Sequence, residues 1–329
     1  MKNVLLIALA FVFYACDGVE PLPTSQDGIP IVRSEATFEV MVEEDVVYAE
    51  GLSHDSINSP NYSTESLKLD IYSPHDDTEN RPLFMFIHGG GFRGGSKQQD
   101  DIVNIAHYFA SRGWVFISVA YRKMGKIGTL PQEWIDNIPN LPADVEDPEQ
   151  YLAMYPAHRD TKAALRWIMS QKEDHKINED YVTVGGASAG AVQAITLGIS
   201  NVEDYRDELT TDQDPSLFTT HLDETYEIKT IIDFWGSKSG LDALEFNYGH
   251  QRFDANDPPM LIIHGTADGT VAFSKAEELK AIYESNGVAF EFYPLEGGGH
   301  KAWNAKVDNK RVEDLAFDFM VKQQNLNLE

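Results

Sequence analysis

The residues best suited to chemistry in this sequence surround one serine, in the motif Gly186-Ala187-Ser188-Ala189-Gly190. A strand-like stretch, residues 181–185, precedes the motif, and a helical run follows it. A strand-to-helix turn this tight admits only small side chains near the serine. It raises the hydroxyl above the sheet at a helix N-terminus, where negative charge is favoured. The pattern predicts that Ser188 is a nucleophile.

A second glycine-rich motif, His88-Gly89-Gly90-Gly91, ends a continuous apolar run over residues 83–87. Glycines let the backbone lie close to a ligand and turn its N–H groups inward. The tetrahedral intermediate of an acyl transfer needs such donors for its oxyanion. We expect this loop to supply them together with the N–H of Ala189, the residue after the nucleophile.

A serine hydroxyl needs a base to take its proton, and the base needs an orienting carboxylate. Asp268 comes just after an apolar run that ends at Gly265, so it would lie at the C-terminal end of a strand. His300 follows three glycines after the last expected strand, 32 residues beyond Asp268. These two residues are the predicted acid and base.

Other acids and histidines are weaker candidates for these roles. Asp233 lies inside a strand-like run and is the competing acid, and His250 is the alternative base. We expect His264 to lie at the edge of the core and His88 to support the glycine loop.

Strand-like and helix-like segments alternate from about residue 36 onward. Such alternation predicts an α/β protein with a mostly parallel sheet covered on both faces, whose ligands bind beyond the C-terminal ends of the strands. We expect an antiparallel hairpin at the start, and strands over residues 37–42, 46–51, 65–72, 83–87, 114–120, 181–185, 228–234, 259–263 and 289–294. Helices are expected over residues 102–112, 160–171, 191–197, 275–286 and 312–324. Residues 123–158 and 201–227 do not fit the alternation and are expected to be lids, pocket walls or disordered loops.

The composition excludes several classes of protein. The chain has 329 residues, 42% hydrophobic and 24% charged, as in an ordinary globular protein. Its formal net charge of −27 disfavours nucleic acid and anionic lipid surfaces as partners. There is no HExxH motif, no pair of cysteines, no dinucleotide-binding motif and no P-loop, so we expect neither a metal nor a cofactor.

The N-terminal residues resemble an export signal. Lys2 precedes an apolar run, Val4–Phe13, which is too short to span a bilayer, and the only cysteine, Cys16, follows it. A lone cysteine there resembles the lipobox of bacterial lipoproteins, in which the cysteine is lipidated. We therefore expect a signal peptide over residues 1–15, a tether over 16–35 and one catalytic domain over 36–329, exported and anchored to a membrane through Cys16. The alternative is plain secretion after cleavage near Gly18.

Taken together, the motifs resemble the α/β-hydrolase superfamily, specifically its HGGG-bearing esterase and lipase branch, over about residues 60–325. This resemblance implies an eight-stranded sheet, a triad of Ser188, Asp268 and His300 in the family's chain order, and oxyanion donors at Gly90, Gly91 and Ala189. The motifs that carry it are Leu67–Tyr72, His88–Phe92, Ser118–Arg122, Asp160 with Ala163–Ile168, Gly186–Gly190, His264–Asp268 and Gly299-His300.

The predicted function is that of a serine esterase. Two alternatives stay open: a serine peptidase of the prolyl-oligopeptidase type, and a catalytically silent binding module on the same fold. Many acidic residues in 201–227 disfavour a lipid surface, so we expect short acyl groups, on a small molecule or a carbohydrate. The rings of Trp134, Tyr151 and Tyr155 would either stack on a sugar or pack the insertion onto the body.

Overall fold

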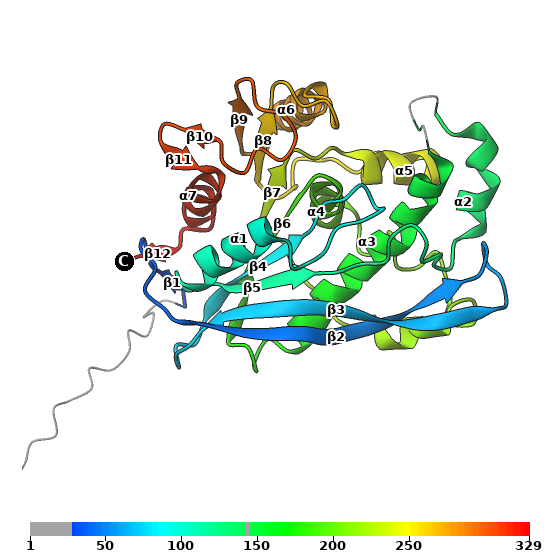
Figure 1. Ribbon diagram of the computed structural model, residues 1–329, viewed down its shortest axis with the longest axis horizontal. Helices are drawn as coiled ribbons and strands as arrows, with labels where there is room; N and C mark the ends of the chain where they lie inside the picture. The colour runs from blue at the N-terminus through cyan, green and yellow to red at the C-terminus, as the bar shows by residue number, and fades with distance from the viewer. Residues whose placement is uncertain (1–27, 143–144, 146) are drawn as a thin grey trace, which may run out of the picture.

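The computed structural model describes residues 28–142, 145 and 147–329. Its centre is an eight-stranded sheet in the order β2-β3-β5-β4-β6-β7-β8-β9 (Figure 1). The pairs β2/β3 and β3/β5 are antiparallel, and every other neighbouring pair is parallel. The predicted mostly parallel sheet with an antiparallel hairpin at its start is therefore confirmed. The strands are Val40–His54 (β2), Tyr62–Pro74 (β3), Arg81–Ile87 (β4), Val115–Val119 (β5), Ile177–Ala187 (β6), Thr230–Phe234 (β7), Met260–Gly265 (β8) and Phe290–Leu295 (β9).

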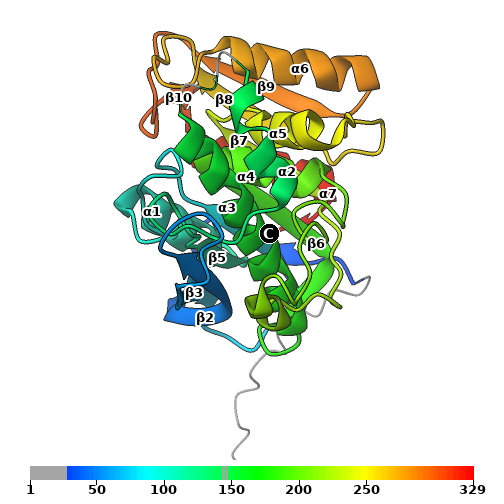
Figure 2. The same ribbon diagram turned by 90° about the vertical axis from the view of Figure 1, so that its right-hand side faces the viewer.

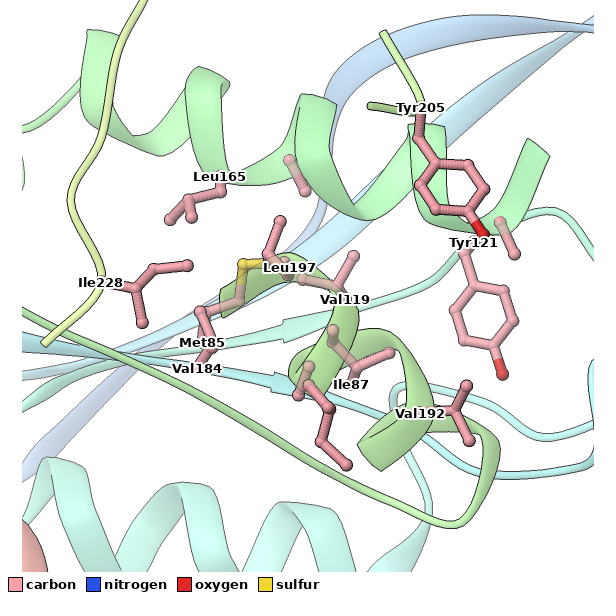
Figure 3. Packing of buried hydrophobic residues seen from close by; sticks show 14 of the residues in the cluster. Met85, Ile87, Val119, Tyr121, Leu165, Val184, Val192, Leu197, Tyr205 and Ile228 are labelled. Atoms are coloured by element: carbon pink, nitrogen blue, oxygen red, sulfur yellow. The ribbon is translucent and has the colours of Figure 1, made fainter. Parts of the chain in front are cut away.

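The central strands are buried on both faces, as their continuous apolar runs predict. Every residue of β4, β5, β7 and β8 is buried. Along β4, Met85 and Ile87 contribute to one hydrophobic cluster and Phe84 and Phe86 to the other, because successive side chains point to opposite faces. Figure 3 shows Met85 in the first cluster, near Leu165 and Leu197 of the covering helices. This buried double-faced sheet is the rigid platform for the loops at its strand ends.

Helices cover both faces of the sheet (Figure 1, Figure 2). The buried residues of α1 (Asp100–Ala110) and α7 (Val312–Gln324) pack in the cluster that contains Phe84. Those of α3 (Pro148–Ser170), α4 (Ala189–Ile199), α5 (Ser239–Tyr248) and α6 (Ser274–Asn286) pack in the cluster that contains Met85. Since α4 begins directly after β6, its N-terminus lies at the edge of the sheet where the parallel strands end.

The hairpin differs from its prediction in one respect. The two short strands expected over 37–42 and 46–51 form one continuous strand, β2, with register shifts between Glu43 and Val46 and between Val47 and Ala49. Asp45 has a φ of 57°, and its N–H donates to the Asp70 carboxylate at 2.8 Å. The polar residues 43–45, which suggested a break between strands, therefore mark an irregularity inside one strand.

The start of the described chain is part of the folded body. Residues 28–35 were expected to belong to a tether, but β1 (Ile31–Val32) pairs in parallel with β12 (Asn327–Leu328), and Val32 is fully buried. The prediction is therefore wrong for these residues. The expected signal peptide, the lipidated Cys16 and the rest of the tether lie outside the described residues. Among the described residues, no helix is both long enough and apolar enough to cross a membrane.

The two segments expected to be long loops contain regular structure. Residues 123–158 include α2 (Gln132–Asp136), a 3-10 turn (Ile138–Asn140) and the first eleven residues of α3, which is nearly twice as long as the helix expected over 160–171. Asp147 caps α3 by accepting from the N–H groups of Glu149 and Gln150. Residues 201–227 contain a 3-10 helix, Pro215–Thr219. Two short strands, Lys306–Val307 (β10) and Lys310–Arg311 (β11), form a separate hairpin.

Candidate active site

Ser188 occupies a strained turn between β6 and α4, as its motif predicts. Its φ is 56° and its ψ is −124°, a conformation that L-residues rarely adopt. A Cβ on Gly186 would lie 2.3 Å from the carbonyl carbon of Gly190, and one on Gly190 would lie 2.0 Å from the carbonyl oxygen of Ile87. Both glycines are therefore required by close backbone packing. The Ser188 N–H donates to the Phe234 carbonyl at 2.9 Å, which ties the turn to β7.

The structure brings Ser188, Asp268 and His300 together in a chain of two hydrogen bonds. His300 Nδ1 lies 2.7 Å from Asp268 Oδ2, and His300 Nε2 lies 3.0 Å from Ser188 Oγ. A carboxylate only accepts hydrogen bonds, so Nδ1 carries the proton and Nε2 is left to accept from the serine hydroxyl. This is the geometry in which an imidazole can take the proton of a serine.

Asp268 is held in one orientation by its own turn. Its Oδ1 accepts from the N–H groups of Thr270 at 2.8 Å and Val271 at 3.0 Å, so Oδ2 faces His300. Burial raises the pKa of Asp268, but the hydrogen bonds from His300, Thr270 and Val271 outweigh it and hold that pKa below its ordinary value. Asp268 is therefore ionised at neutral pH and stabilises positive charge on His300.

Tight packing of two glycine-containing loops brings Asp268 and His300 into contact. A Cβ on Gly265 would lie 2.3 Å from the Gly298 carbonyl oxygen and 2.6 Å from that of Gly299. The Ala267 N–H donates to the Gly298 carbonyl at 2.9 Å. Gly265 is thus needed for the loop before His300 to pass close to the end of β8, and within the glycine run that was predicted as flexible only Gly297 has a positive φ, 69°.

The glycine loop lies directly against the serine. A Cβ on Gly89 would lie 2.6 Å from the Ala187 carbonyl oxygen and 3.1 Å from Ser188 Cβ. Gly90 and Gly91 have φ values of 129° and 63°, which favour glycine. Within the described part of the chain, the N–H groups of Gly90, Gly91 and Ala189 donate to no protein acceptor. These three donors are the ones that the resemblance assigns to an oxyanion.

His88 supports the glycine loop, as expected. Its ring stacks on Tyr121 with centroids 4.4 Å apart, and the Tyr121 hydroxyl donates to the His88 carbonyl at 3.0 Å. Its Nδ1 contacts the Gly89 carbonyl at 2.7 Å. Burial lowers the pKa of His88 to about 4, so the ring is neutral at pH 7.

The sequence motifs missed a residue that orients this loop. The Gln150 side-chain N–H donates to the Gly91 carbonyl at 2.8 Å. Gln150 lies in the first turn of α3, whose start was not predicted. It also accepts a long hydrogen bond from Arg93 at 3.5 Å. Recognising Asp147 as a helix cap followed by Pro148 would have placed the helix start correctly.

Among the described residues, neither the competing acid Asp233 nor the alternative base His250 is hydrogen-bonded to Ser188, Asp268 or His300. Asp233 is fully buried, and its Oδ1 accepts from the Gly236 N–H at 2.7 Å, with no contact to His300. His264 Nε2 lies 3.3 Å from Asp268 Oδ2 and 2.9 Å from the Val271 carbonyl, so it braces the acid. His250 is exposed in the loop after α5. Neither His250 nor His264 contacts Ser188 among the described residues.

A tryptophan that the motifs did not highlight packs behind His300. Trp235 follows β7 with a φ of 47° and is fully buried. Its ring meets that of His300 edge-on at a centroid distance of 6.4 Å and that of Trp303 at 4.6 Å. A bulky residue with positive φ at the end of a strand is unusual. Its position beside the imidazole restricts where His300 can move.

The three rings of the insertion are not available to a ligand. Trp134 and Tyr155 are fully buried, and Tyr151 is 5% exposed. Trp134 stacks on Tyr151 at 4.8 Å, and both belong to the main hydrophobic cluster. Of the two alternatives left open by the sequence, the structure therefore favours packing of the insertion onto the body over stacking on a sugar.

A cavity of about 230 Å³ lies next to the glycine loop. It is lined by apolar groups of Met124, Leu152 and Pro156, with Lys123 at its wall. The Met124 N–H donates to the Phe92 carbonyl at 2.7 Å, and Lys123 Nζ donates to the Gly95 carbonyl at 2.8 Å. These contacts join the cavity wall to the loop that carries Gly90 and Gly91. Among the described residues, no group of three or more His, Cys, Asp or Glu side chains is placed to hold a metal ion.

The model of the BD-FAE family matches residues 69–136 and 149–252, which is more than half of the chain. The protein belongs to the BD-FAE family. The match contains the glycine loop, Ser188 and Gln150, whereas Asp268 and His300 lie beyond it. This family assignment confirms the resemblance to the esterase and lipase branch of the α/β-hydrolases.

Comparison with individual proteins agrees with the BD-FAE assignment. The chain is 28% identical over 201 residues to carboxylesterase 1C of Rattus norvegicus, covering 59% of this chain and 33% of that protein. It is 24% identical over 255 residues to esterase LipC of Mycobacterium tuberculosis, covering 70% and 56%. The chain thus spans about a third of the rat carboxylesterase that it matches.

Solved structures of Thermogutta terrifontis esterase 2 have the same fold. The form phosphorylated by paraoxon superposes with a TM-score of 0.58 at 23% identity, covering 86% of this chain and 94% of that one. The butyrate-bound form gives a TM-score of 0.57 at 22% identity, covering 87% and 94%. These neighbours confirm the predicted α/β-hydrolase fold.

Proposed function

We propose that the protein is a serine hydrolase of carboxylic esters that prefers short acyl groups. The observation that carries the proposal is the hydrogen-bonded chain from Asp268 through His300 to Ser188, with the serine in a strained turn. Membership of the BD-FAE family and similarity to named esterases support the same reaction.

In the proposed reaction, Ser188 Oγ attacks the ester carbonyl carbon while its proton passes to His300 Nε2. The carbonyl oxygen becomes an oxyanion, which accepts from the free N–H groups of Gly90, Gly91 and Ala189. The tetrahedral intermediate collapses, the C–O bond to the alcohol breaks, and His300 returns the proton to the leaving oxygen. Water then attacks the acyl-serine with the same histidine as base, which releases the acid and restores Ser188.

The proposed preference for short acyl groups has two supports, a small cavity that borders the chain after the glycine loop and the ligands of two similar esterases. The 230 Å³ cavity is apolar over much of its wall, but it is small compared with most ligand pockets. Two of the neighbouring esterase structures were solved with propionate and butyrate bound. Because the three rings are buried, they cannot stack on a sugar. An acetylated carbohydrate is therefore tested as one substrate among several, alongside simple esters.

The test is hydrolysis of nitrophenyl esters from acetate to octanoate, with Ser188→Ala beside the exposed-serine control Ser285→Ala. We expect turnover to fall steeply between butyrate and octanoate, to be lost by several orders of magnitude in Ser188→Ala, and to be unchanged in the control. Faster turnover of long esters at an emulsion surface would contradict the short-acyl preference. Cleavage of a prolyl amide instead of esters would favour the peptidase, and no turnover of either would favour a silent binding module.

We also propose that the protein is exported and anchored by lipid on Cys16. The support is the short apolar run that ends at Phe13, with two residues between it and the only cysteine. Wild type should partition into detergent, and Cys16→Ser should release it or block its processing, because acyl chains supply the membrane affinity. An unmodified mature N-terminus at Val19 would contradict the proposal and favour plain secretion.

A further inference from the structure

A second imidazole touches the carboxylate of the triad. His264 belongs to β8 and is fully buried, and its Nε2 lies 3.3 Å from Asp268 Oδ2. The same nitrogen lies 2.9 Å from the carbonyl oxygen of Val271. Because His300 Nδ1 lies 2.7 Å from the same carboxylate oxygen, Asp268 Oδ2 contacts two histidine rings at once.

The surroundings of His264 determine which of its nitrogens carries the proton. Carbonyl and carboxylate oxygens only accept hydrogen bonds, so Nε2 must be the protonated nitrogen. Burial lowers the pKa of His264, although the Val271 carbonyl and Asp268 oppose this shift, so the ring is neutral at pH 7. The single N–H of this ring is therefore directed entirely at the acid and its turn.

The other nitrogen of His264 shows that packing alone does not explain a histidine here. Nδ1 is buried and has no hydrogen-bond partner among the described residues. A buried acceptor without a partner costs free energy, and an apolar side chain at this place would avoid that cost. The contribution of the histidine must therefore come from the Nε2 side of the ring.

That side of the ring closes the turn that orients the acid. The Val271 N–H donates to Asp268 Oδ1 at 3.0 Å, beside the N–H of Thr270 at 2.8 Å, and the Val271 carbonyl accepts from His264. The Asp268 side chain has no exposure to solvent, so bulk water does not reach it to replace a lost donor. His264 thus fixes the residue that fixes Oδ1, and this leaves Oδ2 facing His300.

We propose that His264 is a positioning residue of the triad, whose Nε2–H holds the Val271 turn and lies beside Asp268 Oδ2. It contacts neither Ser188 nor His300 by hydrogen bond among the described residues, so it acts only through the acid. The inference rests on the proposed esterase reaction and adds a fourth side chain to it. A misplaced acid impairs the orientation of His300 during proton transfer, so its loss should lower kcat and leave KM unchanged.

The test compares His264→Gln with His264→Met, two side chains of similar length and volume. The glutamine Nε2 can occupy the place of the imidazole Nε2 and donate to the Val271 carbonyl, whereas methionine has no N–H or O–H donor. We expect His264→Met to lower kcat for nitrophenyl acetate about tenfold, the effect of losing one hydrogen bond beside a charge. We expect KM to be unchanged and His264→Gln to retain kcat within a few-fold of wild type.

Two controls separate positioning from general damage to the core. Ile263→Val lies on the same strand, but its side chain packs in the other hydrophobic cluster, so it should lower the unfolding free energy and leave kcat unchanged. The proton NMR signal of the His300 Nδ1–H needs no substrate, so it reports on the acid even if the proposed ester hydrolysis is wrong. We expect this signal in wild type and His264→Gln, and its broadening by exchange with water in His264→Met, because a loosened turn exposes the proton.

Wild-type kcat in His264→Met, or a sharp Nδ1–H signal in that variant, would overturn the proposal and leave His264 as a core residue. Equal losses of kcat in the glutamine and methionine variants would overturn it as well, since the donor would then not matter. If His264→Met does not fold, His264→Asn takes its place, because its amide is too short to reach the Val271 carbonyl and the same losses are expected.

Discussion

Replacing Asp268 by asparagine tests the triad most sharply, because the structure fixes how the amide would sit. Asp268 Oδ1 accepts from two backbone N–H groups, of Thr270 and Val271. In Asp268→Asn the amide oxygen must take that position, since the NH₂ group cannot accept. The NH₂ group then faces His300 Nδ1 and also His264 Nε2, which already contacts the Val271 carbonyl at 2.9 Å.

The imidazole must respond by changing tautomer. His300 Nδ1 would become the acceptor, so the proton would move to Nε2, which faces Ser188 Oγ at 3.0 Å. A protonated Nε2 cannot accept the serine proton. The same tautomer change in a well-studied serine protease lowers turnover about 10⁴-fold. We expect a loss of the same order here, equivalent to about 5 kcal/mol of transition-state stabilisation.

The assay is steady-state hydrolysis of nitrophenyl acetate by wild type, Asp268→Asn and Asp233→Asn, with circular dichroism to check folding. Asp233 is the matched control because it is buried at the end of the neighbouring strand without touching His300. Its variant should keep turnover within several-fold of wild type. The reasoning is refuted if Asp268→Asn retains more than a few per cent of turnover, or if Asp233→Asn loses as much.

Two further predictions concern stability. Burial raises the pKa of Asp233 to about 7, so between about pH 4 and about pH 7 the folded state holds a proton that the unfolded state has lost. The stability that this group contributes therefore falls as the pH rises through that window. Asp233→Asn should flatten the fall in urea unfolding free energy over that range; an unchanged slope would show that Asp233 titrates normally. Trp134→Ala should lower the unfolding free energy by about 3–5 kcal/mol, because removal of the buried ring leaves a cavity, and it should leave KM for nitrophenyl acetate unchanged. A raised KM at wild-type stability would instead mean that the ring binds substrate.

The triad and the glycine loop could be predicted because their chemistry leaves local signals. A serine between small residues after an apolar run specifies a turn, and the turn specifies where the hydroxyl points. Asp268 and His300 could be placed because the carboxyl ends of parallel strands meet at one edge of the sheet. The periodicity of 312–324 gave the bounds of α7 correctly, since an amphipathic pattern directly reports which face is buried.

The missed features depend on contacts between distant segments. The start of α3 lacks an amphipathic pattern because residues 151–169 are buried on nearly every side, so periodicity could not reveal it. Residues 28–35 have a loop-like composition, and their strand pairs with residues 327–328, which lie near the other end of the sequence. The rings of the insertion could have been exposed or buried, and only tertiary packing decides between the two.

Part of the backbone strain in the described chain lies at the site. Phe92, Ser188, Trp235 and Lys301 have φ values of 57°, 56°, 47° and 63°. Each is a site residue or adjoins one, on a turn that follows β4, β6, β7 or β9. Such conformations cost of order 1–3 kcal/mol each and persist only where the surroundings enforce them. The fully buried central strands and the close glycine contacts at Gly190 and Gly265 provide that enforcement. In the proposed reaction, the donors, the hydroxyl and the imidazole are therefore held in position before a substrate arrives, and little reorganisation remains for the reaction itself.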